Sequence, residues 1–393
     1  MKNKRIMIVH SIAWSHYAAL TFSELYKILN LEGNNLLVIH IAKSNLNRKG
    51  IGDYDSSIHK YPHKILYDGF YEHFRLSDEI MILNKELISY KPDILIVSGL
   101  SDVGILSAIV INKILKSKNI VVSDTTYVDR KRFKYKEILK SKILKLFDGA
   151  FCVGTAQKEY MLKLGMKEEN IFIASYYAVD NEFIYDKYIK SYESRLSIKR
   201  ISKLKENNFI YSGRMLESKN PALLIRAFNS IKQREERSKS WGIIIVGDGP
   251  QKDELKALVK KLDLEKDVFF AGGKSWREVP EYYAIADVLV LPSISEAWGL
   301  VVNEAMVCGL PVIVSKRAGS YWDLVQEGEN GFGFDPYNQE DLEQIMLKFI
   351  RGEVDRKQMG EGSKNIIEDY TPENAAKQML YGIKKVLGLN SSS

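Results

Sequence analysis

SISEAWGLVVNE (residues 293–304) is the stretch that decides the fold and the site of this 393-residue chain. The apolar run 288–291 just before it predicts a strand, and the residues after Gly299 predict a helix. A strand that runs into a helix N-terminus makes an anion site, because the free N–H groups and the helix dipole favour negative charge. Gly299 has no Cβ and lets the backbone approach a ligand. Glu296 and Glu304 would then border one pocket, although acidic residues are also common as a solvated pair near a helix start.

Short apolar runs recur on both sides of this stretch, and segments of helical spacing separate most of them. Continuous apolar strands that alternate with helices indicate buried parallel sheets, and two such series predict two doubly wound α/β domains, over residues 1–187 and 205–370. The charged segment 186–205 has few regularly spaced apolar residues and is interpreted as a linker. The predicted strands lie at 6–9, 36–41, 94–97, 120–122, 150–153, 171–174, 209–211, 243–246, 268–270, 288–291 and 312–314.

Composition excludes several classes of protein. The chain is 45% hydrophobic, and no run approaches the roughly 20 apolar residues of a membrane helix. Residues 1–10 are interpreted as a first strand rather than a signal peptide. The two cysteines, Cys152 and Cys308, have apolar neighbours, which favours buried thiols over a disulfide or a metal site. We therefore expect a cytoplasmic protein.

The net charge of +7 is concentrated in residues 129–147, where eight Lys and Arg residues face two acidic ones and apolar residues interleave with them. One interpretation is a basic amphipathic helix that contacts an anionic membrane. The other is a solvated helix face whose apolar side lies in the core. Nucleic acid is not favoured, because no recognition motif accompanies the charge.

Polar groups and glycines follow each strand of the second half. Because the carboxyl ends of parallel strands meet at one sheet edge, we expect these groups to lie together. Two cations, a helix N-terminus, glycine-lined turns and two carboxylates at one edge fit a nucleotide diphosphate that carries a polyhydroxy group. The groups are Gly213, Arg214, Lys219, Gly247, Gly272, Gly273, Glu296 and Glu304.

These motifs, in this order, resemble the retaining, nucleotide-sugar-dependent glycosyltransferases of family 4. The resemblance covers about residues 208–340 and rests on the segments 212–214, 219–220, 247–250, 268–272, 296–304, 305–313 and 330–332. It implies the GT-B fold, in which two Rossmann-like domains face a central cleft. It also implies that the last helix, at 373–390, packs back on the first domain, which the apolar spacing there allows.

The resemblance implies a role for each matching residue. Arg214 and Lys219 would hold and stabilise the departing diphosphate. Glu296 would contact the hydroxyls of the donor sugar, and Glu304 those of the ribose. The remaining donor-binding positions are the backbone at Trp298, Gly299 and Leu300 and the glycines Gly213, Gly247, Gly272 and Gly273. Trp298 stands where the family commonly has phenylalanine.

The first half departs from the family pattern. Residues 10–17 replace the glycine-rich loop that often follows the first strand. A histidine is common after the fourth strand, and this chain has Asp124 in that region. Either Asp124 takes the catalytic place of that histidine, which is the role we assign to it, or no side chain does. His10 and His16 are candidates for the acceptor side, and a purely structural role for both stays open.

The expected activity is retaining transfer of a sugar from a nucleotide-diphosphate sugar, UDP-linked rather than GDP-linked, to a glycan, lipid-linked or other acceptor. Such a reaction would serve polysaccharide or glycoconjugate synthesis at the inner membrane face. No cofactor and no metal is expected: Asp53 and Asp55 have the spacing of a metal-binding pair, but they lie outside the donor edge. The alternatives are a non-catalytic GT-B subunit that stabilises a partner enzyme, and a GT-B epimerase or phosphorylase.

Overall fold

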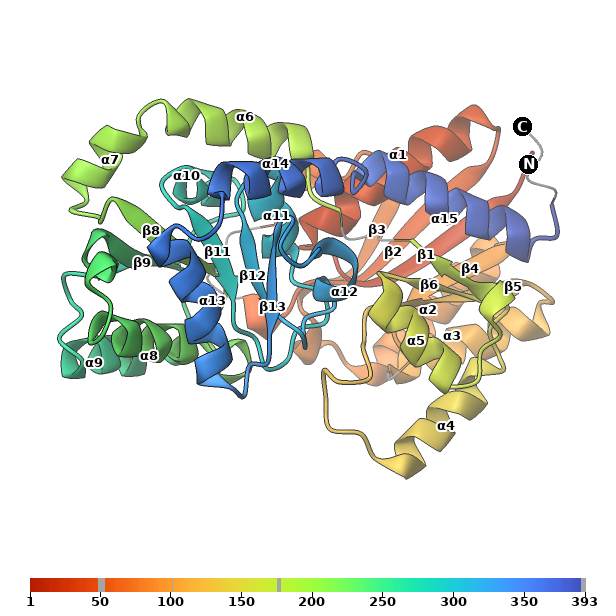
Figure 1. Ribbon diagram of the computed structural model, residues 1–393. Helices are drawn as coiled ribbons and strands as arrows, with labels where there is room; N and C mark the ends of the chain where they lie inside the picture. The colour runs from red at the N-terminus through yellow and green to blue at the C-terminus, as the bar shows by residue number, and fades with distance from the viewer. Residues whose placement is uncertain (49–53, 101, 175–177, 390–393) are drawn as a thin grey trace. The chain divides into compact units, whose positions relative to one another are not determined.

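The computed structural model describes residues 1–48, 54–100, 102–174 and 178–389, in two compact units (Figure 1). The first unit comprises Met1–Ala178 and Tyr370–Ser393, and the second comprises Val179–Asp369. Each unit is built around its own parallel sheet. Asp53 and residue 390, the end of the last predicted helix, lie outside the described residues.

The first unit has a seven-stranded sheet with the order β3-β2-β1-β4-β5-β6-β7. Neighbouring strands pair in parallel, and His10 of β1 lies opposite His40 of β2. Its strands are β1 (Arg5–Ile12), β2 (Asn35–Ser44), β3 (His63–Phe70), β4 (Ile94–Ser98), β5 (Lys118–Ser123), β6 (Gly149–Cys152) and β7 (Ile171–Ile173). Its helices are α1 (His16–Leu31), α2 (Leu76–Tyr90), α3 (Val103–Ile114), α4 (Lys134–Leu144), α5 (Thr155–Lys163) and α15 (Pro372–Val386).

The second unit has a six-stranded parallel sheet with the order β10-β9-β8-β11-β12-β13. Its strands are β8 (Asn207–Ser212), β9 (Trp241–Val246), β10 (Val268–Gly272), β11 (Val288–Leu291), β12 (Val312–Ser315) and β13 (Gly331–Phe334). Its helices are α6 (Asn181–Tyr192), α7 (Arg195–Ile201), α8 (Pro221–Lys232), α9 (Lys252–Lys261), α10 (Val279–Tyr283), α11 (Leu300–Val307), α12 (Tyr321–Leu324), α13 (Gln339–Arg351) and α14 (Arg356–Ile367).

Burial of the central strands explains their continuous apolar runs. Every residue of β9, β11 and β12 is buried. Figure 1 shows α8, α9 and α13 on one side of the second sheet and α10, α11 and α14 on the other. A parallel sheet that is covered on both faces needs apolar side chains in both directions, which is the pattern in the sequence.

Two edge strands escape the sequence prediction. β3 is mostly half-buried, and β13 reads Gly-Phe-Gly-Phe, so neither shows a continuous apolar run. Both lie at the end of a sheet. β3 has only partial cover and so needs fewer apolar side chains than a central strand, whereas β13 is mostly buried but alternates glycine with phenylalanine.

The predicted linker at 186–205 is wrong. This segment forms most of α6 and all of α7, and the division between the units falls at 178–179 instead of 187. Polar contacts hold the two helices to the second unit: Arg195 and Lys199 donate to the half-buried carboxylate of Asp287, at 2.6 and 3.3 Å. A charged segment that pairs with a carboxylate elsewhere in the chain shows little apolar periodicity.

The interpretation that places the apolar side of the basic helix in the core holds only for its last turn, where Leu144 and Ile143 pack in or against the core of the first unit. In α4, Leu144 is buried, whereas Tyr135, Ile138 and Leu139 are exposed. The final helix behaves as the resemblance implies: α15 packs along α1, and Lys384 pairs with Glu32 at 2.7 Å. Throughout the described parts of the chain, no helix combines the length and apolar character needed to span a membrane.

Candidate functional site

The order in which strands are added to the second sheet reverses between β8 and β11, which lie side by side at its centre. From β8 the strand order runs one way through β9 to β10, and from β11 it runs the other way to β13. The loops after two such strands diverge and leave a crevice at their carboxyl ends, where open α/β sheets bind ligands. The segments 213–220 and 292–299 follow these two strands, so the predicted residues fall at this switch point.

An ion pair joins the two loops. The ammonium of Lys219 lies 2.6 Å from a carboxylate oxygen of Glu296 and 3.4 Å from the carbonyl oxygen of Ser295. The two side chains are 24% and 16% exposed, so a ligand at the surface can reach both groups. Ser293 lies 3.5 Å from the same Glu296 oxygen. A cation and a carboxylate are thus held together at the end of the two central strands.

Backbone hydrogen bonds fix the Glu296 loop. The N–H groups of Ile294 and Ser295 both donate to the carbonyl of Ser218, at 2.9 and 3.1 Å. On the other side, the N–H of Gly319 donates to the carbonyl of Glu296 at 3.2 Å. The loop therefore keeps its position without a ligand, which lowers the entropy cost of binding one.

Gly299 opens α11 in a conformation that suits glycine. Its φ is +100°, and a Cβ there would lie 2.8 Å from Cδ2 of Leu291 and 3.2 Å from Cγ of Glu296. The hydroxyl of Ser320, 3.4 Å from that Cβ position, is buried and has no hydrogen-bond partner among the described residues. The start of α11 therefore combines free N–H groups with a close approach of backbone to the Glu296 side chain.

The tryptophan in this motif is committed to the interior. Trp298 is 4% exposed, and its indole N–H donates to Oδ1 of Asn303 at 2.9 Å. A ligand would therefore meet the backbone at this position and not the ring. Leu300, the first residue of α11, is half-buried and offers its N–H at the helix start.

Glu304 lies inside α11 and is 4% exposed. The hydroxyl of Tyr283, from α10, donates to its Oε2 at 2.8 Å. Burial and this carboxylate hold the pKa of the Tyr283 hydroxyl well above its ordinary value, so the hydroxyl keeps its proton and its role as donor. Tyr283 escapes the sequence prediction, because nothing in its spacing from Glu304 relates the two helices.

The predicted glycines stand where backbone segments come close. At Gly247, with φ of +140°, a Cβ would lie 1.9 Å from the carbonyl oxygen of Gly213. The N–H of Gly247 donates to the carbonyl of Gly272 at 2.8 Å, which ties together the segments after β9 and β10. Gly272 has open space where a Cβ would point, and at Gly273 the nearest atom is Cβ of Asp248, at 3.5 Å. These turns leave room for a flat group against the backbone.

Arg214 is the second residue after β8 and is half-buried. Tyr211 donates its hydroxyl to the Arg214 carbonyl at 2.6 Å, which holds the backbone of the turn. The structure records no hydrogen bond or ion pair to the Arg214 guanidinium within the residues it describes. This side chain is a second cation from the same loop as Lys219.

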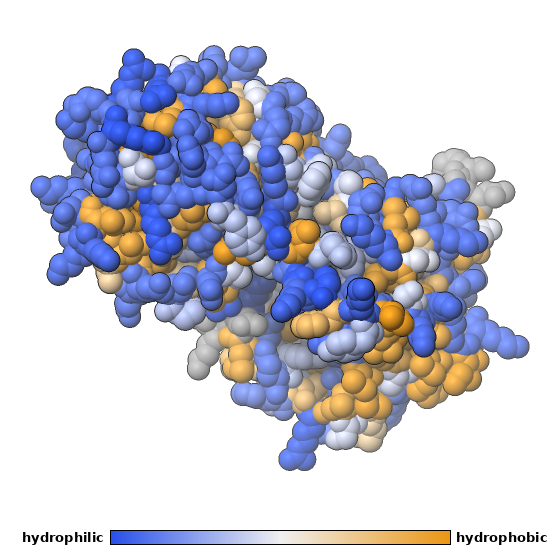
Figure 2. Space-filling model, turned by 60° about the horizontal axis from the view of Figure 1, so that its bottom comes forward, coloured by the Kyte–Doolittle hydropathy of each residue, from blue (hydrophilic) through white to orange (hydrophobic). Residues whose placement is uncertain are grey.

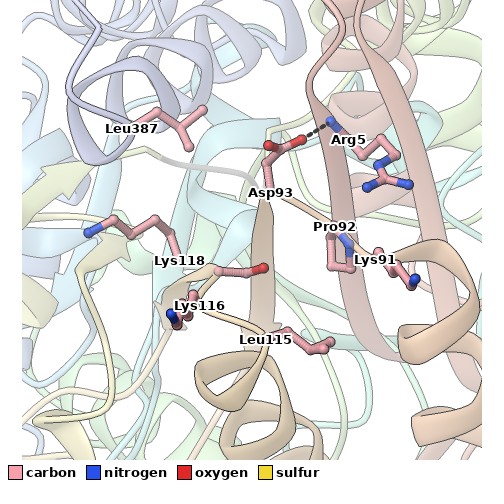
Figure 3. A pocket seen from close by; sticks show the side chains of 9 residues that line it. Arg5, Lys91, Pro92, Asp93, Leu115, Lys116, Lys118 and Leu387 are labelled. Carbon is pink, nitrogen blue, oxygen red and sulfur yellow. Dashed lines mark hydrogen bonds between the residues drawn. The ribbon is translucent and has the colours of Figure 1, made fainter.

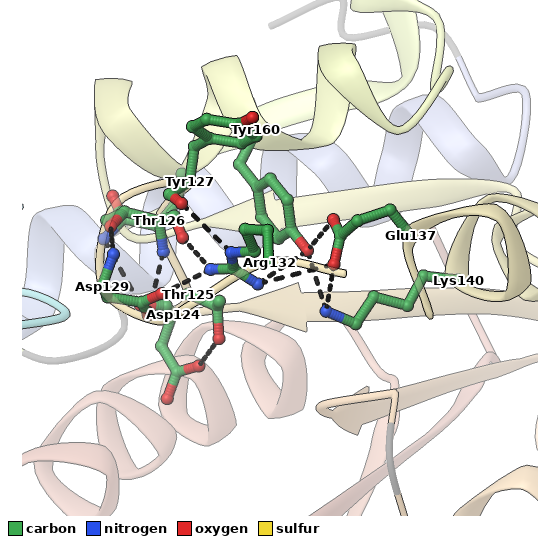
Figure 4. Close-up of polar contacts among 10 residues, drawn as sticks. Asp124, Thr125, Thr126, Tyr127, Asp129, Arg132, Glu137, Lys140 and Tyr160 are labelled. Atoms are coloured by element: carbon green, nitrogen blue, oxygen red, sulfur yellow. Dashed lines mark hydrogen bonds and ion pairs between the residues drawn. The ribbon is translucent and has the colours of Figure 1, made fainter. Parts of the chain in front are cut away.

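In the first unit, Asp124 is the residue after β5. Its carboxylate accepts a long hydrogen bond from Thr125, at 3.4 Å, and burial raises its pKa above the ordinary value. Figure 4 shows this carboxylate pointing away from the polar network around Arg132 that occupies the same loop. The side chain is thus not committed to that network.

His10 and His16 are both 4% exposed. Nδ1 of His10 lies 2.9 Å from the carbonyl oxygen of Ile12, and its ring packs edge-on against Phe22 and His40. Burial lowers the pKa of His10 to about 4. Both imidazoles therefore belong to the packed interior of the first unit, which favours the structural interpretation of these residues over a role at the surface.

The remaining predictions concern loops and thiols. Asp55 accepts hydrogen bonds from the backbone and the side chain of Ser57, at 3.0 and 2.6 Å, and so caps a short turn. Cys152 and Cys308 are buried and not joined in a disulfide, as predicted. The parts of the chain that the structure describes contain no group of three His, Cys, Asp or Glu side chains that could hold a metal ion.

A cavity of about 460 Å³ lies at the edge of the first sheet where its strands begin, opposite to their carboxyl ends (Figure 3). It is lined near the amino ends of β1, β4 and β5 by Arg5, Lys91, Asp93, Lys116 and Lys118, among others. In Figure 3 the side chains of Lys91 and Lys118 point away from each other, so the cations do not converge on one ligand. This cavity is separate from the strand ends where the predicted residues lie.

Comparison with known proteins finds similarities that centre on the second unit. Residues 194–366 match the family described as Glycosyl transferases group 1. The sulfoquinovosyl transferase SQD2 of Arabidopsis thaliana is 37% identical over 131 residues, which are 33% of this chain and 25% of that protein. The lipopolysaccharide 1,2-N-acetylglucosaminetransferase of Salmonella typhimurium is 27% identical over 54% of this chain and 57% of its own length. The chain therefore spans only part of the length of these curated relatives.

A solved structure extends the likeness of fold to nearly the whole chain. The structure of Anabaena Alr3699/HepE in complex with UDP-glucose has a TM-score of 0.73 over 98% of this chain and 100% of that chain, at 17% identity. Two parallel-sheet α/β units with this likeness constitute the GT-B fold. The chain thus has the GT-B fold, and its residues 194–366 match the Glycosyl transferases group 1 family.

Proposed function

We propose that this chain transfers a sugar from a nucleotide-diphosphate sugar to an acceptor and retains the anomeric configuration. The observation that carries the proposal is the Lys219–Glu296 pair, which brings a cation and a carboxylate together at the switch point beside the start of α11. A diphosphate needs the cation and the helix N–H groups, and a sugar needs the carboxylate. The Anabaena structure with UDP-glucose supports a UDP-linked donor.

The ion pair suggests how the donor enters. In the free protein, Lys219 neutralises Glu296 at 2.6 Å. A bound diphosphate would draw the ammonium away and leave the carboxylate to accept hydrogen bonds from sugar hydroxyls. Exchange of one charged partner for another limits the desolvation cost of binding.

The leaving diphosphate gains negative charge as the sugar–phosphate bond breaks. Lys219, Arg214 and the N–H groups at the start of α11 follow the two central strands, and fixed positive groups that face the leaving diphosphate would lower the barrier without reorganisation. They supply the charge stabilisation that many glycosyltransferases take from a metal, so we propose a metal-independent reaction without a cofactor. The acceptor hydroxyl would attack on the face that the phosphate leaves and pass its proton to that phosphate.

The remaining residues complete the proposed assignment. Glu304, held by Tyr283, would bind the ribose, while the turns at Gly272 and Gly273 would hold the base. The first unit would bind the acceptor, with Asp124 as its polar group. The acceptor would be a glycan or a lipid-linked molecule in polysaccharide or glycoconjugate synthesis, in line with the name of the Salmonella relative, a lipopolysaccharide 1,2-N-acetylglucosaminetransferase.

The test is a thermal-shift screen against UDP-, GDP- and ADP-sugars, followed by measurement of nucleotide release. We expect a UDP-sugar to raise the melting temperature and to release UDP when acceptor is present. Glu304→Gln should abolish both effects, whereas Glu343→Gln, at an equally buried carboxylate on α13, should leave them intact. Binding without release under all acceptors tested would favour the non-catalytic subunit instead.

A further inference from the structure

Helix α4 presents the apolar residues of its first two turns to solvent, whereas Ile143 and Leu144 at its end pack toward the core. Tyr135, Ile138 and Leu139 are 67%, 58% and 59% exposed, and of its eleven residues, all described, Leu144 alone is buried. A helix on a globular domain normally turns its apolar stripe toward the core. The reversed arrangement leaves a contiguous apolar surface on one helix without cover.

A polar network occupies the inner side of the helix (Figure 4). Glu137 accepts hydrogen bonds from Lys140 and from the hydroxyl of Tyr160 on α5, at 3.0 and 2.6 Å. Arg132 pairs with Asp129, and its guanidinium lies 4.4 Å from the centre of the Tyr160 ring. These contacts anchor α4 to α5 through charges, so the outward position of the apolar residues is built into the fold.

The charges of the network cancel, whereas the residues of the segment outside the network carry a net positive charge. It uses two cations, Arg132 and Lys140, and two carboxylates, those of Asp129 and Glu137. The segment 129–145 has eight cations and these two acids, so six cations have no opposing charge within it. All six are exposed, and the described residues record no hydrogen bond or ion pair to their side chains; they are Arg130, Lys131, Lys134, Lys136, Lys142 and Lys145.

The apolar surface continues into the loop before the helix. Phe133 is 42% exposed, and the ammonium groups of Lys131 and Lys136 lie 5.8 and 5.4 Å from its ring centre. Tyr127 is also exposed. Figure 2 turns the bottom of Figure 1, where α4 lies, toward the viewer and shows hydrophobic residues at that surface among hydrophilic ones. We call residues 127–145 with these side chains the α4 face.

We propose that the α4 face docks on an anionic lipid membrane. Aromatic and aliphatic side chains would enter the boundary between headgroups and acyl chains, while the six cations would bind lipid phosphates around them. A second copy of the chain is a poor occupant, because self-association through this face would bring six unopposed cations against six others. The acyl region of a membrane can take up Ile138 and Leu139, whereas the backbone of a nucleic acid offers no apolar site for them.

The test is co-sedimentation with vesicles of phosphatidylcholine, with and without phosphatidylglycerol. We expect binding to the anionic vesicles alone, and weaker binding as salt rises. Lys134→Gln/Lys136→Gln should weaken binding about 25-fold, since each basic residue near an anionic surface contributes about a fivefold factor. Ile138→Ser/Leu139→Ser should weaken it at least about tenfold.

The matched control is Lys256→Gln/Lys260→Gln, which removes two exposed lysines from α9 of the second unit and should leave vesicle binding unchanged. Equal binding by wild type and both α4 variants, or no preference for anionic vesicles, would overturn the proposal. So would a dimer in light scattering that Ile138→Ser/Leu139→Ser converts to monomer. Thermal shift by UDP-sugar, expected to persist in every variant, keeps this test separate from that of sugar transfer.

Discussion

Replacing Lys219 with methionine tests the proposed chemistry most sharply, because methionine keeps similar length and removes the charge. Loss of one fixed donor to a developing anion costs about 3–4 kcal/mol of transition-state stabilisation, or about 10²–10³ in kcat. The cost to folding should be smaller, about 1–2 kcal/mol, because the Lys219–Glu296 pair is 24% and 16% exposed and solvent screens it. Activity should therefore fall far more than stability.

The assay is release of UDP from a UDP-sugar with acceptor present, together with a thermal melt of each variant. Lys239→Met is the matched control, since Lys239 also pairs with a glutamate, Glu236, but at an exposed site in another loop. The control should keep wild-type turnover.

A double-mutant cycle separates chemistry from packing. If Lys219 serves only to neutralise Glu296, then Glu296→Gln in the Lys219→Met background should restore activity. If the two bind different parts of the donor, the double variant should be slower than either single variant. Wild-type turnover in Lys219→Met, or rescue by Glu296→Gln, would refute the assigned roles.

Three further predictions concern stability. Gly247→Ala should destabilise the second unit by about 3 kcal/mol or more, because its Cβ would lie 1.9 Å from the Gly213 carbonyl oxygen. The control Gly328→Ala, where φ is +80° and the space is open, should cost about 1–2 kcal/mol. Equal melting temperatures for the two variants would contradict this. Burial lowers the pKa values of His10 and His59 from 6.5 to about 4, so the unfolded chain binds more protons than the folded chain between these pH values. The free energy of unfolding should therefore fall as pH drops from 6.5 toward 4, by up to about 3 kcal/mol for each histidine. In pH-dependent melts, His59→Gln should make this fall less steep. Asp287→Asn removes the common partner of Arg195, Lys199 and Arg356 and should lower the free energy of unfolding by about 3 kcal/mol or more. It should also expose residues 180–205 to limited proteolysis. The control Asp253→Asn, on the surface of α9, should change neither the stability nor the proteolysis pattern.

The central strands could be predicted from the sequence because their burial leaves an unbroken apolar run. Val288–Leu291 has the same bounds in the sequence pattern and in the structure. The edge strands β3 and β13 could not, since partial cover removes that signal from β3 and two glycines interrupt it in β13. Much of the donor edge was also predictable: once strand ends are known, Lys219 and Glu296 must follow neighbouring strands, although 76 residues separate them.

The remaining features could not be predicted from the sequence, because they depend on contacts between charged residues that are distant in sequence. The helices α6 and α7 look like a linker because ion pairs to Asp287 partly replace apolar packing. The direction of α4 was equally hidden, since an amphipathic pattern does not say which face is inside. Only the partner, Tyr160 on α5, shows that the charged face is the inner one. Tyr283 and Ser320, beside Glu304 and Gly299, have no local signal at all.

The most direct test of the account is hydrogen–deuterium exchange of the wild-type protein with and without a UDP-sugar. The account predicts slower exchange in peptides that cover residues 212–220 and 293–304, where the ends of β8 and β11 would enclose the diphosphate. Protection confined to other segments, with these two peptides unchanged at saturating donor, would contradict it.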